Sequence, residues 1–393
     1  MQPAAGTAIF VENGPTDPSL PAGVLNPMPR NSPEREPAPE PRLPRRAILQ
    51  AGALGALAAA TSLAAGNAEK PAPNPPDADC DCDCESEVAR RPGREVWIAS
   101  LTLEGIPSSS REETVRQVLA RMEQVAGARP DLICLPETFN GRYTPRPTSA
   151  AQAEPIDGPT ITAMAAFAKA KRCYVVAPIT LDRGGTLFNT AVLLDRAGKV
   201  AGAYDKLHPT EKELQGGITP GRDTAKVFAT DFGKLGIQIC FDIDWPDGWQ
   251  ALKDQGAELV VWPAAYPGGF PLNALAWTHR YPIVTSPWTT PATLIDVDGQ
   301  VLVKSGTWEP WINTPFYLDR GLFHLDFHLP KLRALEKAHG REVTVRWSHD
   351  ENAFVLENRV PGKTLAQLAA EFDLLPIDAY LARAKSAQDR ARG

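Results

Sequence analysis

The chain lacks an excess of positive charge, since its formal net charge is −6 over 393 residues. A surface that binds nucleic acid or an anionic membrane needs a basic patch, so this composition argues against both kinds of partner. After residue 68 the chain also has no hydrophobic run long enough to cross a bilayer. No two cysteines have the CxxC spacing of zinc sites, so we assign no zinc ligands.

The longest segment without charge lies between Arg46 and Glu69, and it is rich in alanine and glycine rather than leucine and isoleucine. Its length fits a bilayer span, but its weak hydropathy and its small-residue end favour a cleaved export signal. Arg45 and Arg46, followed by hydrophobic residues, resemble a twin-arginine signal. We expect residues 1–68 to be a leader with this signal, and the mature protein to be periplasmic or extracellular without a stable membrane anchor. An uncleaved anchor and uninformative low complexity are the alternatives.

Residues 1–46 contain eleven prolines and almost no apolar periodicity, so a packed core is not expected there. Their basic and acidic residues balance, five against five, which is unusual for the leader of a signal peptide. A start at Met28 would remove Glu12 and Asp17, leaving five basic residues against three acidic ones and a net charge of +2.

Residues 69–95 are rich in proline and acids and are expected to be a linker. Within it Cys80, Cys82 and Cys84 alternate with aspartates. Alternate residues of an extended chain point to opposite faces, so the three thiols converge only where the chain turns. A flexible linker with adventitiously oxidised cysteines, a soft-metal site and an intermolecular disulfide all stay open.

From residue 96 onward, short apolar runs alternate with amphipathic segments. The pattern predicts helices at 111–126, 160–171 and 246–255, and strands at 96–103, 131–135, 173–179, 188–194, 199–204, 234–240, 258–262, 283–286, 292–297 and 301–304. Asp195–Gly198 and Asp298-Gly299 are turns that predict hairpins. Alternating helices and strands with some hairpins indicate an α/β domain with a mixed sheet, which we place at residues 96–329.

Residues 330–393 are expected to form a C-terminal extension. Its pattern predicts helices at 331–339, 364–372 and 377–392 and strands at 343–347 and 354–356. Such tails often wrap around a neighbouring subunit, so we expect a homodimer or a higher homo-oligomer.

Three reactive residues follow predicted strands: Glu137, Lys206 and Cys240. Ligands of α/β proteins collect at the carboxyl ends of strands, so the three side chains could converge there. Taken singly, each has an ordinary explanation as a loop acid, a solvated cation and a small buried apolar residue.

Their contexts are LPETF, YDKLHPTEKEL and GIQICFDIDWPDGWQALKDQGAELVVWP. These segments resemble the three catalytic motifs of the nitrilase (carbon–nitrogen hydrolase) superfamily, in the same order and with compatible separations, over roughly residues 96–326. Asn189 also stands where the family has an asparagine before a strand. The resemblance implies a four-layer αββα domain of mixed sheets flanked by helices.

The resemblance also implies a mechanism. Cys240 is the nucleophile, and Glu137 takes its proton and later activates water against a thioester. Lys206 and the backbone N–H of Phe241 stabilise the oxyanion. No metal or organic cofactor is required. The substrate is a small molecule with a non-peptide carbon–nitrogen bond: an amide, a carbamoyl compound or a nitrile. Two other cysteines, Cys134 and Cys173, lie in apolar strand sequence and are expected to be inert packing residues.

Two further positions bear on the site. Many family members have a second glutamate after the lysine, and Glu213 matches it better than Glu211 by its distance to Pro220-Gly221. Asp244 stands where the family often has an arginine. If Asp244 lines the pocket, its charge favours cationic or amine-bearing amides; the alternative is that it caps the following helix.

Two other functions fit parts of the sequence. An N-acyltransferase could use the same three residues, although the membrane-embedded acyltransferases of this superfamily have several spanning helices and this chain has none after residue 68. A non-catalytic exported protein that binds metal through its thiols could be built on the CDCDC run and a degenerate hydrolase domain.

Overall fold

The computed structural model describes residues 91–393. The leader, the Arg45-Arg46 pair, most of the predicted linker and the cysteines at 80, 82 and 84 lie outside the described residues. The described chain starts with a short 3₁₀ turn, η2 (Pro92–Arg94), and then enters the first strand. No helix among residues 91–393 is long and apolar enough to cross a membrane.

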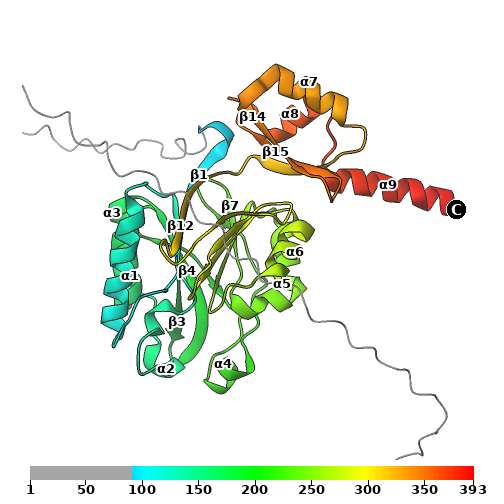
Figure 1. Ribbon diagram of the computed structural model, residues 1–393. Helices are drawn as coiled ribbons and strands as arrows, with labels where there is room; N and C mark the ends of the chain where they lie inside the picture. The colour runs from blue at the N-terminus through cyan, green and yellow to red at the C-terminus, as the bar shows by residue number, and fades with distance from the viewer. Residues whose placement is uncertain (1–90) are drawn as a thin grey trace, which may run out of the picture. The chain divides into compact units, whose positions relative to one another are not determined.

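Two six-stranded mixed sheets form the main domain (Figure 1). The first has the order β12-β1-β2-β3-β4-β5, and β1, β2 and β3 run parallel at its centre. The second has the order β11-β10-β9-β8-β7-β6, with β7, β8 and β9 parallel. The strands of the first sheet are β1 (Glu95–Leu101), β2 (Leu132–Cys134), β3 (Tyr174–Arg183), β4 (Thr186–Leu194), β5 (Val200–Asp205) and β12 (Trp311–Tyr317). Those of the second are β6 (Phe228–Ala229), β7 (Lys234–Ile237), β8 (Leu259–Ala264), β9 (Ile283–Pro287), β10 (Thr293–Ile295) and β11 (Val301–Lys304).

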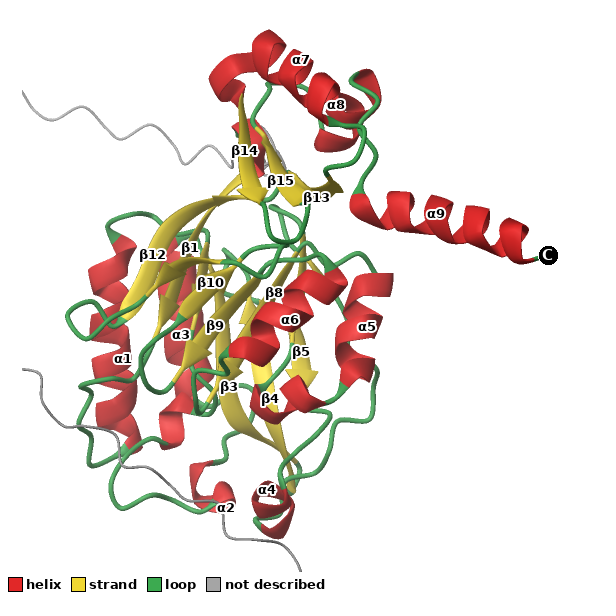
Figure 2. Ribbon diagram, turned by 45° about the vertical axis from the view of Figure 1, so that its right-hand side comes forward, coloured by secondary structure: helices red, strands yellow, loops and turns green. Residues whose placement is uncertain are grey.

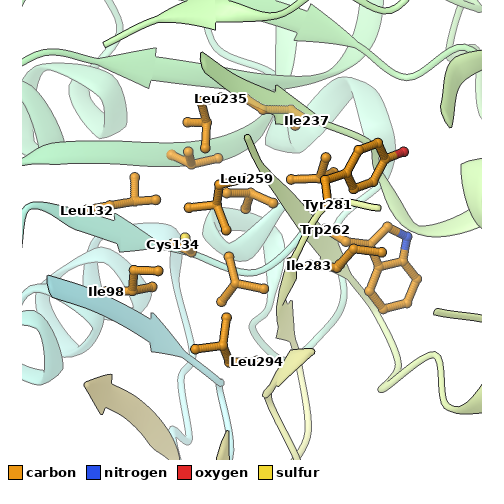
Figure 3. Close-up of a cluster of buried hydrophobic side chains, with 14 of the residues drawn as sticks. Ile98, Leu132, Cys134, Leu235, Ile237, Leu259, Trp262, Tyr281, Ile283 and Leu294 are labelled. Carbon is orange, nitrogen blue, oxygen red and sulfur yellow. The ribbon is translucent and has the colours of Figure 1, made fainter. Parts of the chain in front are cut away.

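The two sheets pack face to face, and their inner faces form the largest core. Figure 3 shows Ile98, Leu132 and Cys134 of the first sheet against Leu235, Leu259 and other apolar residues of the second. Because both faces of each central strand are covered, these strands are continuous apolar runs without polar alternation.

Helices cover the two outer faces and complete the four-layer αββα arrangement that the family resemblance implied (Figure 2). Helices α1 (Arg111–Ala126) and α3 (Pro159–Lys171) lie on the first sheet, and α5 (Pro246–Asp254) and α6 (Phe270–His279) lie on the second. The predicted α1 has the observed bounds, and its side chains Met122 and Val125 are fully buried. Thr114 and Val118 are also buried, while Val115 and Leu119 are only partly so.

Several elements differ from their prediction. The sequence pattern missed α6 and β12, and it ended β3 before the Arg183–Thr186 turn that joins β3 to β4 in a long hairpin. Strand β7 ends at Ile237 rather than at residue 240. Two short helices, α2 (Ser149–Gln152) and α4 (Glu211–Gln215), and the 3₁₀ turns η3 (Phe139–Gly141) and η4 (Cys240–Asp244) lie near the strand ends.

The C-terminal extension has its own three-stranded sheet, with the order β13-β15-β14. Its strands are β13 (Arg320–His324), β14 (Val343–Ser348) and β15 (Ala353–Asn358), and its helices are α7 (Leu329–His339), α8 (Leu365–Glu371) and α9 (Ile377–Arg392), with the turn η5 (Gly340–Glu342). The predicted start at residue 330 comes after β13, which pairs with β15 and shares the apolar core of the extension. We therefore draw the extension from Arg320. Most of α9 is exposed, and it extends away from the other elements.

Ion pairs attach the extension to the turn between β10 and β11. Arg346 lies 2.5 Å from Asp296 and 2.6 Å from Asp298. Arg320 lies 2.7 Å from Asp296 and also pairs with Glu357. Both aspartate side chains are fully buried. We call these five residues the interface cluster. Breaking one partner of such a buried pair leaves an uncompensated charge, so the extension and the main domain depend on each other.

Candidate active site

Cys240 lies in the turn after β7, not at the end of the strand as predicted. It opens the 3₁₀ turn η4, and its φ of 46° is in the left-handed region that residues with a side chain rarely adopt. Its carbonyl accepts a hydrogen bond of 3.1 Å from the indole Nε1 of Trp262 on β8. The surroundings thus hold Cys240 in a strained backbone conformation, a feature that clusters at functional sites.

Asp242 fixes this turn to the segment that carries Lys206. Its Oδ2 accepts hydrogen bonds from the N–H of Ile239 (2.9 Å) and from the hydroxyl of Tyr204 (2.8 Å). Its Oδ1 accepts from the backbone N–H of His208, also at 2.9 Å. Asp242 is completely buried. One carboxylate therefore connects the turn of the nucleophile to the end of β5, a role that the sequence did not reveal.

Lys206 follows β5 directly, and its side chain is buried. Its Nζ lies 3.0 Å from Glu137 Oε1 and 2.7 Å from Glu213 Oε2. Burial alone would lower the pKa of Lys206, but the negative charges of Glu137 and Glu213 outweigh it, and the net result is a raised pKa. Lys206 is thus a permanent positive charge that is itself buried.

Glu137 follows β2, and a second donor orients its carboxylate. The Nδ2 of Asn189 lies 2.8 Å from the same oxygen, Oε1, that Lys206 contacts. The Nε1 of Trp288 holds the backbone carbonyl of Glu137 at 2.6 Å. The next residue, Thr138, has a φ of 41°, so a second left-handed position borders the site. With Oε1 occupied by two donors, the second carboxylate oxygen is the one available to the thiol of Cys240, which lines the same cavity.

The structure brings Glu213, and not Glu211, to the lysine. Glu213 forms a capping box with Thr210 at the start of α4, which fixes its backbone position. Its Oε1 accepts a hydrogen bond of 2.8 Å from Asn189, and its Oε2 contacts Lys206. Burial would raise the pKa of Glu213, but Lys206 and Asn189 lower it overall. Glu211 is exposed.

The surroundings keep the thiol of Cys240 protonated. Burial raises its pKa, the negative charge of Glu137 raises it further, and Lys206 and the N–H of Ala265 offset only part of this. A protonated thiol is a poor nucleophile, so it needs a base at the moment of attack. The neighbouring carboxylate of Glu137 is in position to be that base.

A cavity of about 580 Å³ opens onto these groups. Besides Glu137, Lys206 and Cys240 it is lined by Asn189, Glu213, Ala265 and Trp288, and by residues of the 146–152 and 210–218 segments. Its size is in the range of pockets that hold small molecules. A second cavity, of about 400 Å³, lies at Arg183, Asp205 and Arg222 and contains none of the three predicted catalytic residues.

Asp244 lies at the end of η4 and is exposed. It is not among the residues that line the cavity. It also does not cap α5, whose N-cap position is Trp245 without a side-chain cap. Burial raises the pKa of Tyr266 to about 12 and the charge of Asp244 contributes, so Asp244 lies within electrostatic reach of Tyr266. Its predicted contact with substrate stays a prediction.

The other described cysteines, Cys134 and Cys173, are fully buried in the two cores. Burial raises the pKa of Cys173 to about 12, and it also raises that of Cys134. Their predicted inertness toward alkylation stays a prediction. Within residues 91–393, no group of three or more histidine, cysteine, aspartate or glutamate side chains could hold a metal ion.

A strained cysteine beside a glutamate and a buried lysine, between two mixed sheets, is the arrangement expected of a cysteine-dependent hydrolase. Residues 98–313 match the family model described as carbon-nitrogen hydrolase, and the chain belongs to this family.

Curated relatives include the hydrolase C26A3.11 of Schizosaccharomyces pombe, 28% identical over 40% of this chain and 53% of that protein. The omega-amidase NIT2 of Mus musculus is 27% identical over 51% of this chain and 82% of its own length. The N-carbamoylputrescine amidase of Arabidopsis thaliana is 31% identical over 44% of this chain and 59% of its own length. The chain spans about half the length of the first relatives that it matches.

Among solved structures, a carbon-nitrogen hydrolase from Helicobacter pylori G27 has a TM-score of 0.50 at 18% identity, over 57% of this chain and 90% of that one. A double mutant of the amidase from Nesterenkonia sp. AN1, in complex with acrylamide, has a TM-score of 0.51 at 17% identity, over 61% of this chain and 97% of that one. These likenesses show the fold of the main domain.

Proposed function

We propose that this protein is an amidohydrolase that cleaves a non-peptide carbon–nitrogen bond through a thioester on Cys240. The observation that carries the proposal is the convergence of Glu137, Lys206 and Cys240 on one cavity of about 580 Å³. The names of the curated relatives, several of them amidases, support an amide as the first substrate class to test. Carbamoyl compounds and nitriles come next.

In the first half-reaction the thiol proton moves to Glu137 while the sulfur of Cys240 attacks the carbonyl carbon of the amide. The carbonyl electron pair moves to the oxygen, where Lys206 and the backbone N–H of Phe241 stabilise the negative charge. When the carbon–nitrogen bond breaks, protonated Glu137 gives its proton to the departing nitrogen, and ammonia leaves. An acyl thioester stays on Cys240.

In the second half-reaction Glu137 takes a proton from water, and the resulting hydroxide attacks the thioester. The carbon–sulfur bond breaks, the carboxylic acid leaves, and Glu137 returns its proton to the sulfur. Asn189 and Glu213 take no part in bond making, but they hold Glu137 and Lys206 in place through the hydrogen bonds described above.

Ammonia release from a panel of primary amides tests the proposal. Cys240→Ala and Cys240→Ser should lower kcat/KM at least about a thousandfold and leave thermal stability close to the wild type. Cys134→Ala is the matched control, because it removes another buried thiol that lies away from the cavity. Near-normal turnover by Cys240→Ala would contradict the mechanism.

The same assay separates the two alternative functions. Added hydroxylamine or a primary amine captures the acyl group if the protein is an acyltransferase, and the hydroxamate or new amide then exceeds the free acid. A non-catalytic thiol or metal-binding protein releases no ammonia from any amide or nitrile.

We also propose export through the Arg45-Arg46 signal, which lies outside the described residues. Replacing both arginines by lysine should keep the protein in the cytoplasm, as measured by fractionation. N-terminal sequencing of exported protein should find a start near Glu69. An exported form that retains residues 47–68 would indicate an anchor instead.

A further inference from the structure

The side chain of Asp242 is completely buried and carries a charge. Its Oδ2 accepts hydrogen bonds from Ile239 and Tyr204, and its Oδ1 accepts one from the backbone N–H of His208. The ring Nδ1 of His208 lies 3.0 Å from the same Oδ1. Because each oxygen faces two donors, the carboxylate has no place for a proton of its own. A buried charge is strongly disfavoured unless an opposite charge pairs with it, and the ring of His208 is in contact to supply that charge.

The ring of His208 lies between two carboxylates. Its Nδ1 faces Asp242 of η4, and its Nε2 lies 3.5 Å from Oδ1 of Asp247 in α5. The ring also stacks on the indole of Trp245, with the centroids 4.8 Å apart and the planes 10° apart. These contacts hold the imidazole in place. His208 thus connects the segment that follows Lys206 to both η4 and α5.

Neither neutral form of the imidazole suits this position. A neutral ring has one N–H and one nitrogen with a lone pair. A proton on Nδ1 alone leaves the lone pair of Nε2 facing Asp247, and a proton on Nε2 alone leaves the lone pair of Nδ1 facing Asp242. The doubly protonated ring instead presents an N–H to each carboxylate. The hydrogen bond to Asp242 raises the pKa of His208 above its ordinary value of 6.5; burial opposes this shift, and the charges of Asp242 and Asp247 add to it.

We propose that His208 is a positioning residue, whose positive charge pairs with Asp242 and so holds the turn of Cys240 against the segment of Lys206. Asp242 binds the turn through the N–H of Ile239, the residue before the nucleophile, and it binds the other segment through His208. Neither His208 nor Asp242 lines the cavity, so both act through the catalytic residues and not on the substrate. When His208 loses its proton, the charge of Asp242 stays buried without this cation, and its hold on the two segments weakens. This inference rests on the amidohydrolase function proposed above.

The pH dependence of kcat/KM for a primary amide, compared between the wild type and His208→Gln, tests the proposal. Glutamine can still donate a hydrogen bond to Asp242, but it cannot carry a charge. We expect kcat/KM of the wild type to exceed that of His208→Gln about 3- to 10-fold at about pH 6. This excess should disappear as the pH rises through the pKa of His208, because the wild type then loses the same charge. The difference should lie in kcat, with KM changed less than about twofold, since His208 does not contact the substrate.

NMR titration of the histidine rings measures the same proton independently of turnover. The chain has six histidines, and the signal of His208 is the one that His208→Gln lacks. Its midpoint should lie above pH 6.5 and coincide with the pH at which the advantage of the wild type declines. Asp247→Asn removes the outer carboxylate, which is 65% exposed, and should lower the NMR midpoint and the decline of kcat/KM together by about half a pH unit. Asp254→Asn is the matched control, because it removes another exposed acid of α5, one that contacts Gln250, and it should move neither.

The outcomes separate two failures. If the ratio of kcat/KM between the wild type and His208→Gln stays constant with pH, or if His208 titrates at or below pH 6.5, the inference is wrong while the amidohydrolase function stands. The same holds if Asp247→Asn moves the NMR midpoint but not the decline of kcat/KM, a comparison that does not need His208→Gln to fold. If no amide is hydrolysed at any pH, both the proposed function and this inference are overturned.

Discussion

Two of the buried charge clusters within residues 91–393 are built in different ways. The interface cluster joins the extension to the β10–β11 turn through Arg320 and Arg346, whose planar guanidinium groups each contact two carboxylates. The catalytic cluster instead has a lysine, Lys206, between two glutamates, and it borders a cavity. Arginine is suited to fixed, multidentate pairing, whereas a lysine is a compact point charge.

The two clusters differ in whether each carboxylate oxygen already accepts a hydrogen bond. In the interface cluster, both oxygens of Asp298 accept hydrogen bonds from Arg346, and Oδ2 also accepts one from the hydroxyl of Ser348. Neither oxygen of this carboxylate is left without a donor. In the catalytic cluster both donors of Glu137 contact Oε1, and its second oxygen is left for the thiol. A carboxylate whose oxygens all have hydrogen-bond donors stabilises the fold, whereas a carboxylate with one oxygen free of donors can exchange a proton.

We expect Glu137→Gln, in the catalytic cluster, to cause the largest loss of activity. The amide keeps the shape and can still accept from Lys206 and Asn189, but it cannot take the thiol proton. We expect kcat/KM to fall at least about a thousandfold, with a melting temperature within a few degrees of the wild type. Lys206 keeps Glu213 as its counterion, so the fold should survive. Substantial ammonia release by this variant would remove Glu137 from the mechanism.

Asp296→Asn, in the interface cluster, should lower the stability of the protein and leave its activity nearly unchanged. Asp296 is fully buried and pairs with both Arg320 and Arg346, so neutralising it leaves two cations short of a partner. We expect a loss of about 2–4 kcal/mol in the free energy of unfolding, measured by urea denaturation. Activity per folded molecule should change less than about twofold, because the cluster does not line the cavity. A selective loss of activity at unchanged stability would mean that the two clusters are coupled.

The pH dependence of stability should report on Asp298 in the interface cluster. Burial would raise the pKa of Asp298, but the hydrogen bonds from Arg346 and Ser348 lower it below its ordinary value of 3.8. A lowered pKa in the folded state stabilises the protein above pH 3.8, and this contribution is lost as the pH falls through the folded pKa. The urea midpoint of the wild type should therefore drop more steeply below about pH 4 than that of Asp298→Asn. Parallel curves would show that Asp298 does not contribute.

Asp244→Asn should have the smallest effect. The side chain is exposed and outside the cavity, so water and salt screen its charge from a bound substrate. We expect the preference between anionic and cationic amides to change less than about twofold, with unchanged thermal stability. A strong loss of cationic substrates would instead place Asp244 against the substrate, as the sequence first suggested.

The elements that could be predicted from the sequence were those with a pattern of their own, such as helical periodicity or an N-cap residue. Helix α1 has amphipathic spacing and a serine N-cap at Ser110, and its bounds were predicted correctly. Helix α6 was missed because it is apolar around most of its circumference and follows two glycines, so it has no helical periodicity to detect. Strand β12 was missed because it contains Pro315, which a strand tolerates at the edge of a sheet, where β12 lies.

The site shows the same division. Each of the three predicted catalytic residues stands in a specific sequence segment, and the structure brings all three to one cavity. Asp242 and Trp288 were not identified because their roles depend on contacts with residues far away in the sequence, the hydroxyl of Tyr204 and the carbonyl of Glu137. Such contacts follow from tertiary packing, which has no signature in a single segment.

The attachment of the extension has a consequence for how the protein is made. A ribosome releases the chain from its N-terminus, so every residue that lines the catalytic cavity has emerged once Trp288 has left the exit tunnel. At that moment strand β1 still lacks its edge partner β12, and Asp296 and Asp298 are about to appear without Arg346. We expect the nascent chain to acquire its final stability only when β14 and β15 have left the exit tunnel. A truncated protein that ends at residue 313, where the family match stops, should therefore remain a substrate for chaperones and proteases even though its catalytic residues are all present.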